Sequence, residues 1–158
     1  MVEEKMFCYQ CQEASKGTGC TVKGICGKGP EVANLQNLLI YAIKGLSYWT
    51  TLGRKHGLKY PDASHLIIKG LFATITNANF DETWFVDKIE EVLYVRDEIK
   101  SEVLQNVEKP SDLPEAATWG KDLDLEDSAS LIVKGLSVGP TWIENEDKRS
   151  LVELIIYG

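Results

Sequence analysis

The sequence predicts an all-α protein: a helical bundle of the three-helix type, preceded by a loop rich in cysteine and glycine. No run of alternating apolar and polar residues supports a β-strand, whereas apolar residues after position 30 recur at helical spacing. Before that position, five glycines interrupt any periodicity: Gly17, Gly19, Gly24, Gly27 and Gly29. We therefore expect a loop over residues 1–29 and a bundle over 30–158. At 158 residues, both belong to one domain.

The first helix is expected to be the central one. Pro30 suits its first turn, because a proline lacks the N–H that finds no partner there. One stripe of apolar residues faces a core, and a second set fills the opposite face: Leu35, Leu38, Leu39, Ala42, Leu46 and Trp49, then Ile40, Tyr41 and Ile43. A helix that is apolar nearly all round is usually buried. Gly53 is expected to end it.

Two further helices are expected to complete the bundle. The first starts at Pro61 and runs to about Asn77. The other is preceded by Asn79 and Glu82, which together resemble a capping box. Its buried stripe is predicted to contain Phe85, Ile89, Val92, Ile99 and Val103.

The remaining chain is predicted to hold two shorter helices. Pro110 ends the long third helix and opens a connector over residues 110–122. A fourth helix is expected from about Asp124 to Leu136, stopped by the Gly139-Pro140 pair. A fifth helix is expected to begin near Asn145.

Charge and hydropathy exclude some classes of function. The net charge is −7 and the isoelectric point about 4.9, which argues against a nucleic-acid partner. No stretch is long and apolar enough for a membrane span, and the N-terminus lacks the apolar region of a signal peptide. We therefore expect a cytoplasmic protein with no membrane partner.

All four cysteines lie in the N-terminal loop, in the pattern Cys8-x2-Cys11-x8-Cys20-x5-Cys26. In a cytoplasmic protein, clustered thiols indicate metal ligands or redox groups before structural disulfides. Four thiolates suit either an iron–sulfur cubane or a structural zinc.

The spacing favours iron–sulfur over zinc without excluding it. Zinc sites commonly use two Cys-x2-Cys pairs, but here the second pair is separated by five residues. Two disulfides, or a redox dithiol at Cys8 and Cys11, also stay open. The glycines favour a cluster, since the chain must curl tightly and present N–H groups to sulfur.

Other polar residues near this loop receive simpler interpretations. His56 is expected at the surface and His65 in a structural role, because neither has a ligand partner at metal spacing. Lys16, Lys23 and Lys28 make the loop locally basic. They are either solvated or guide an electron donor protein.

The cysteine segment is part of a more extensive resemblance. FCYQCQEA (7–14), GTGCTVKGICGK (17–28), GLFATITNAN (70–79) and LPEAATW (113–119) resemble the N-terminal region of the hybrid cluster proteins, also called prismane proteins or hydroxylamine reductases. The similarity covers nearly the whole chain.

The resemblance implies a cofactor and a role. Cys8, Cys11, Cys20 and Cys26 would bind the family's cubane, and the short gap after Cys11 goes with [4Fe–4S] rather than [2Fe–2S]. The domain would relay electrons to a hybrid cluster that reduces hydroxylamine or nitric oxide. That cluster needs further cysteines, and none follows Cys26, so we expect no catalytic residue and no activity from this chain alone. The alternative is a small helical zinc-binding or interaction domain without redox activity.

The last residues suggest a truncated chain. Leu151–Tyr157 repeats the apolar pattern of Leu35–Tyr41, but stops after about two turns. The missing C-terminal domains of the family would then be its partners. Without them we expect the segment to fold back on the bundle or to form a homodimer, which light scattering would detect.

Overall fold

The structure, a computed structural model, describes residues 5–75, 78–120 and 127–157. Within these ranges the all-α prediction is confirmed, since no strand is present beyond one isolated bridge between Cys8 and Cys20. The five α-helices are α1 (Pro30–Lys55), α2 (Pro61–Thr74), α3 (Glu82–Asn106), α4 (Ser128–Val138) and α5 (Glu146–Tyr157). The described residues also form three short 3-10 helices: η1 (Ser15–Gly17) before α1, η2 (Glu115–Ala117) between α3 and α4, and η3 (Pro140–Trp142) between α4 and α5.

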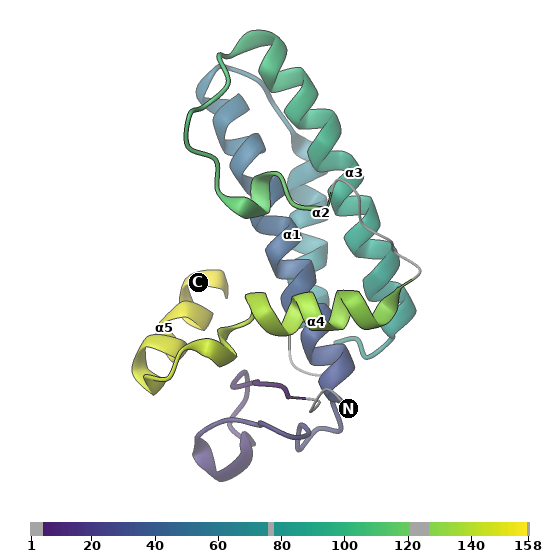
Figure 1. The fold of residues 1–158 in the computed structure, drawn as a ribbon, viewed down its shortest axis with the longest axis vertical. Coiled ribbons are helices and arrows are strands. Elements are labelled where there is room, and N and C mark those ends of the chain that lie inside the picture. The colour runs from purple at the N-terminus through teal and green to yellow at the C-terminus, as the bar shows by residue number, and fades with distance from the viewer. Residues whose placement is uncertain (1–4, 76–77, 121–126, 158) are drawn as a thin grey trace.

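Helix α1 is the centre of the molecule. Figure 1 shows α2 and α3 running along it, with α4 crossing it near its N-terminal end. The predicted stripe of α1 is buried throughout, as is that of α3. These side chains form one core, which buries the large apolar groups that drive folding. The three-helix bundle is therefore α1, α2 and α3.

Two glycines allow other segments to pack directly on α1. A Cβ atom at Gly45 would lie 2.0 Å from the carbonyl oxygen of Ala116 in η2. A Cβ atom at Gly135 of α4 would lie 2.0 Å from the carbonyl oxygen of Asn34 in α1. Neither position can hold a larger residue without moving backbone. These contacts fix η2 and α4 against the central helix.

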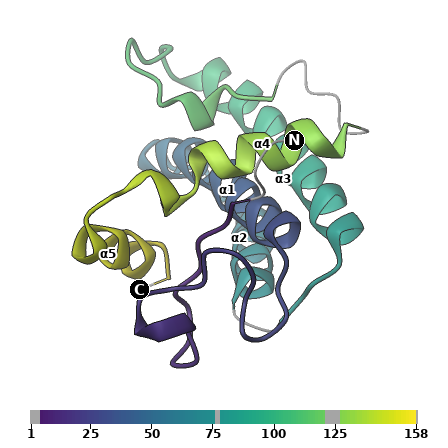
Figure 2. The same cartoon turned by 60° about the horizontal axis from the view of Figure 1, so that its bottom comes forward.

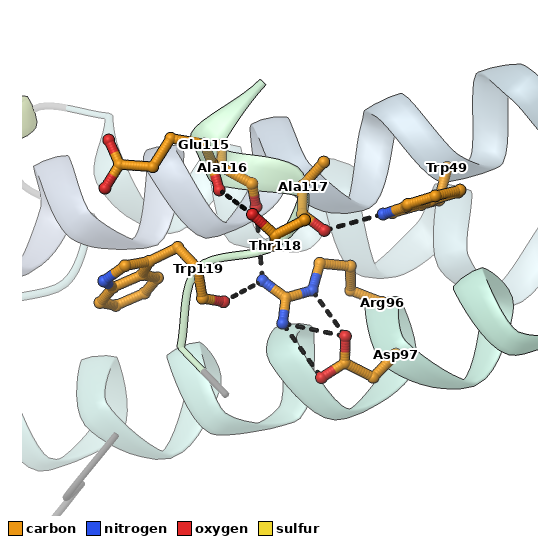
Figure 3. A network of polar contacts seen from close by, with 8 residues as sticks. All are labelled: Trp49, Arg96, Asp97, Glu115, Ala116, Ala117, Thr118 and Trp119. Atoms are coloured by element: carbon orange, nitrogen blue, oxygen red, sulfur yellow. Dashed lines mark hydrogen bonds and ion pairs between the residues drawn. The ribbon is translucent and has the colours of Figure 1, made fainter. Parts of the chain in front are cut away.

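The segment that carries η2 is held by polar contacts as well (Figure 3). Arg96 of α3 is 1% exposed, and its guanidinium donates to the carbonyl oxygens of Ala116, at 3.3 Å, and of Trp119. The indole of Trp49 donates to Ala117 O at 2.9 Å. The polar backbone of this connector is therefore satisfied by side chains of α1 and α3, as burial requires.

Some predicted helix ends were wrong. Helix α1 continues past Gly53 to Lys55, and the chain then turns at Gly57, whose φ is +86°. Gly53 is needed for another reason, because a Cβ atom there would lie 2.6 Å from the Tyr60 hydroxyl oxygen. Helix α3 ends at Asn106, before Pro110.

The predicted capping box also needs correction. The N-cap of α3 is Asp81, whose carboxylate accepts from the Trp84 N–H at 3.2 Å. Asn79 instead accepts from the Asp81 N–H at 2.9 Å, a turn that short polar side chains favour. Helix α2 ends at Thr74, because its C-cap Ile75 is extended, and α4 begins at Ser128 after its N-cap Asp127, so α2 ends earlier and α4 begins later than predicted. The predicted boundaries at Asn77 and Asp124 lie outside the described residues.

Candidate metal centre

The cysteine loop lies beside the N-terminal end of α1, with α5 on its other side (Figure 2). Cys8 and Cys20 are paired across it: Cys8 N–H donates to Cys20 O at 3.1 Å, and Cys20 N–H donates to Cys8 O at 2.8 Å. Residues paired in this way direct their side chains to the same face. The backbone therefore brings one cysteine from each half of the predicted ligand set together.

The four thiols differ in their surroundings. Cys20 is buried and its sulfur accepts from the Ser15 N–H at 3.4 Å. Cys8 and Cys11 are half-buried, Cys26 is exposed, and all four are free. Among the described residues, no three His, Cys, Asp or Glu side chains are grouped as a metal site. Their joint role as ligands stays a prediction from the sequence.

The local structure fits an iron–sulfur ligand set in its chemistry. Four free thiols, a backbone N–H directed at sulfur and a tightly curled chain are what such a cluster uses. A Cβ atom at Gly24 would lie 3.0 Å from Cys26 Sγ, so the backbone passes close to that sulfur. Gly27 has φ of +95°, which closes the turn around Cys26.

Lys28 is buried, which corrects the expectation of a solvated or partner-guiding lysine. It is 1% exposed, whereas Lys16 and Lys23 on the same loop are exposed. Its ammonium donates to Gln36 Oε1 at 2.7 Å and to Gln10 Oε1 at 3.3 Å. Cys8 Sγ lies 3.8 Å from the same nitrogen. A charge removed from water therefore lies directly against a predicted ligand.

The two glutamines are themselves oriented by other elements. Gln36 Nε2 donates to Asn79 O at 3.3 Å, which turns its carbonyl oxygen toward Lys28. Gln10 Nε2 donates to the Tyr157 hydroxyl at 3.0 Å, and that hydroxyl lies 2.7 Å from Thr74 Oγ1. The network joins the loop to α1, α2 and α5.

Burial dominates the electrostatics of this region. It raises the pKa of the Cys8 thiol, while the Lys28 ammonium acts in the opposite direction. It also raises the pKa of the Glu153 carboxyl on α5, again opposed by Lys28 and by Lys44. Burial raises the pKa of Tyr157 to about 12, so its hydroxyl stays protonated at neutral pH.

The histidines lie away from this centre. His56 is the exposed C-cap of α1, at the opposite end of that 26-residue helix from the loop, a separation of roughly 40 Å along its axis. His65 is exposed on α2, so its expected structural role has no support from burial.

Sequence reasoning missed the polar side chains that surround Cys8: Lys28, Gln36 and Gln10. One signal for Gln36 was present, because a polar residue on a helix that is apolar nearly all round must be buried and needs a partner. No comparable signal identifies Lys28 as buried and Lys23 as exposed, since both lie in the same glycine-rich loop.

The C-terminal segment folds back on the bundle, which is one of the two outcomes expected from the sequence. Tyr157 bonds to Gln10 and Thr74, as described above, and Val152, Glu153 and Ile156 are half-buried. The outer face of α5 keeps Leu151, Leu154 and Ile155 exposed. A homodimer through this face stays a prediction.

None of the described helices has the length and apolar composition needed to cross a membrane.

Comparison with known proteins identifies a family and several relatives to which this sequence is similar. The sequence profile of the Prismane/CO dehydrogenase family matches residues 6–158. A hydroxylamine reductase of Desulfitobacterium hafniense (strain DSM 10664 / DCB-2) is 46% identical over 154 residues, which is 97% of this chain and 27% of that protein. One from Parabacteroides distasonis is 48% identical over 153 residues, again 97% and 27%.

A third hydroxylamine reductase, from Thermosipho melanesiensis, is 44% identical over 161 residues, covering 97% of this chain and 28% of that protein. The chain therefore spans about a quarter of the length of the curated relatives it matches.

Proposed function

Because the chain belongs to the Prismane/CO dehydrogenase family, we propose that it is the electron-transferring N-terminal domain of a cytoplasmic hydroxylamine reductase. In this proposal Cys8, Cys11, Cys20 and Cys26 hold a [4Fe–4S] cluster. The whole protein would pass electrons from a donor protein through this domain to a hybrid cluster held elsewhere. The observation that carries the proposal is the single loop of free thiols that closes on a buried ammonium.

A thiolate-bound iron–sulfur cluster supplies storage of single electrons, with a potential set by net charge, hydrogen bonds to sulfur and solvent exposure. The protein contributes to each of these. Ser15 N–H donates to Cys20 Sγ, and the Lys28 ammonium lies against Cys8 Sγ. Helix α5 covers part of the loop, where Gln10 Nε2 donates to the Tyr157 hydroxyl.

The proposal predicts electron transfer without turnover. Protein prepared without oxygen should accept electrons from dithionite and return them to a one-electron acceptor such as ferricyanide. It should not consume hydroxylamine, because no cysteine beyond Cys26 is available for a second cluster. Visible absorption monitors the first process, and hydroxylamine assay the second.

Two results would contradict this account. Protein that cannot be reduced and reoxidised reversibly would remove the electron-transfer role. Steady hydroxylamine consumption that persists through repeated purification would show that this chain holds a reactive centre of its own.

A further inference from the structure

Lys28 and Arg96 are the two most deeply buried cationic side chains in the described part of the chain, and Lys28 is the one beside the cysteine loop. A lysine is rarely fully buried unless it is paired, because removing its charge from water is costly. Here the ammonium has three N–H donors and three acceptors around it: Gln36 Oε1, Gln10 Oε1 and Cys8 Sγ. Its hydrogen-bonding capacity is therefore filled.

The two amide acceptors satisfy the hydrogen bonds but do not balance the charge. Gln36 and Gln10 are neutral. Cys8 becomes anionic when it binds a metal, since thiolates rather than thiols are metal ligands. Among the three hydrogen-bond acceptors of Lys28, only this sulfur can become anionic. The half-buried Glu153 carboxyl on α5 is the other acidic group that interacts with the ammonium, and burial raises the pKa of that carboxyl.

The position of the ammonium is fixed rather than adjustable. Gln36 is buried on α1 and is held by the carbonyl oxygen of Asn79. Lys28 itself closes a turn, because its carbonyl oxygen accepts from the Gly24 N–H at 2.8 Å. The ammonium of Lys28 is therefore held through Gln36, and its backbone is held through Gly24. Neither of these contacts involves Cys8.

We propose that the buried ammonium of Lys28 raises the reduction potential of the cluster bound by the cysteine loop. This rests on the proposed function. The cluster that the four cysteines would hold would accept one electron from a reductant such as dithionite, which would be oxidised, and no bond would form or break. The reduced state carries one more negative charge, so a fixed positive charge beside Cys8 Sγ stabilises it more than the oxidised state.

The test is potentiometric titration of cluster-loaded Lys28→Met, monitored by visible absorption and by electron paramagnetic resonance. Methionine keeps an unbranched side chain of similar length without the charge. We expect the equilibrium for one-electron reduction to become at least tenfold less favourable, a shift of about 59 mV to lower potential.

Lys23→Met is the matched control, because it removes the same charge from an exposed position of the same loop. Its effect should be smaller and should disappear at high ionic strength, since salt screens exposed charges. The shift in Lys28→Met should persist in salt. A potential equal to that of the unsubstituted protein would overturn the proposal for Lys28.

Lys28→Gln and Lys28→Arg keep the experiment decisive if Lys28→Met holds no cluster. If Lys28→Gln loses the cluster while Lys28→Arg retains it, the result would support a requirement for positive charge at this position. Loss from all three variants would overturn the proposal and leave a packing role. Absence of any cluster from the unsubstituted protein would instead remove the proposed function itself, so the two failures are distinguishable.

Discussion

We expect Phe85→Ala to lower the free energy of unfolding by about 3–5 kcal/mol, the usual cost of removing a buried aromatic ring. Phe85 is 0% exposed and belongs to the core between α1 and α3. It also meets Trp84 edge to face, with 5.2 Å between ring centroids. A domain of this size has a total stability of about 5–15 kcal/mol, so the loss should be plain in a urea titration.

Phe72→Ala is the matched control for this experiment, because Phe72 is also helical but 67% exposed. Its cost should stay within about 1 kcal/mol, as for most surface substitutions. If Phe85→Ala were equally mild, the core assigned to α3 would be wrong.

The second large effect is expected from Arg96→Met, at about 3 kcal/mol. The substitution keeps most of the apolar stem but leaves the carbonyl oxygens of Ala116 and Trp119 without their donor. Hydrogen bonds from charged groups contribute about 1.5–3 kcal/mol each, and part of the loss is recovered because Arg96 need no longer be desolvated.

Urea titration should again measure the effect, and tryptophan fluorescence should report the loosened connector, since Trp119 lies in it. Arg54→Met removes an exposed guanidinium that bonds to Ser64 and serves as control. Equal costs for the two variants would mean that the connector is not held by Arg96.

The sequence predicted the fold well because the core of α1 and α3 follows a simple period. Leu38, Trp49 and Phe85 were placed inside from spacing alone, and all three are fully buried. Helix ends were less predictable, since they depend on individual contacts. Gly53 looked like a stop because it is a glycine, but Tyr60 packing on it is a tertiary contact that no local pattern reveals.

In the candidate metal centre, too, local features were predictable from the sequence and tertiary contacts were not. The cysteines were found because their spacing is a local property of the chain. The surroundings of Cys8 were not, because Gln36 and Tyr157, which bond to Lys28 and Gln10 beside it, lie 28 and 149 residues away from Cys8 in the sequence. Lys28 was expected either to be solvated or to guide a donor protein for the same reason: only the folded chain shows that Gln36 and Gln10 enclose it.

Metal analysis will decide whether this loop binds an iron–sulfur cubane. Iron, zinc and acid-labile sulfide should be measured in protein isolated without oxygen, together with Cys8→Ser, Cys11→Ser, Cys20→Ser and Cys26→Ser. We expect about four irons and four sulfides per chain, with lower occupancy in each variant. Stoichiometric zinc without sulfide would contradict this expectation.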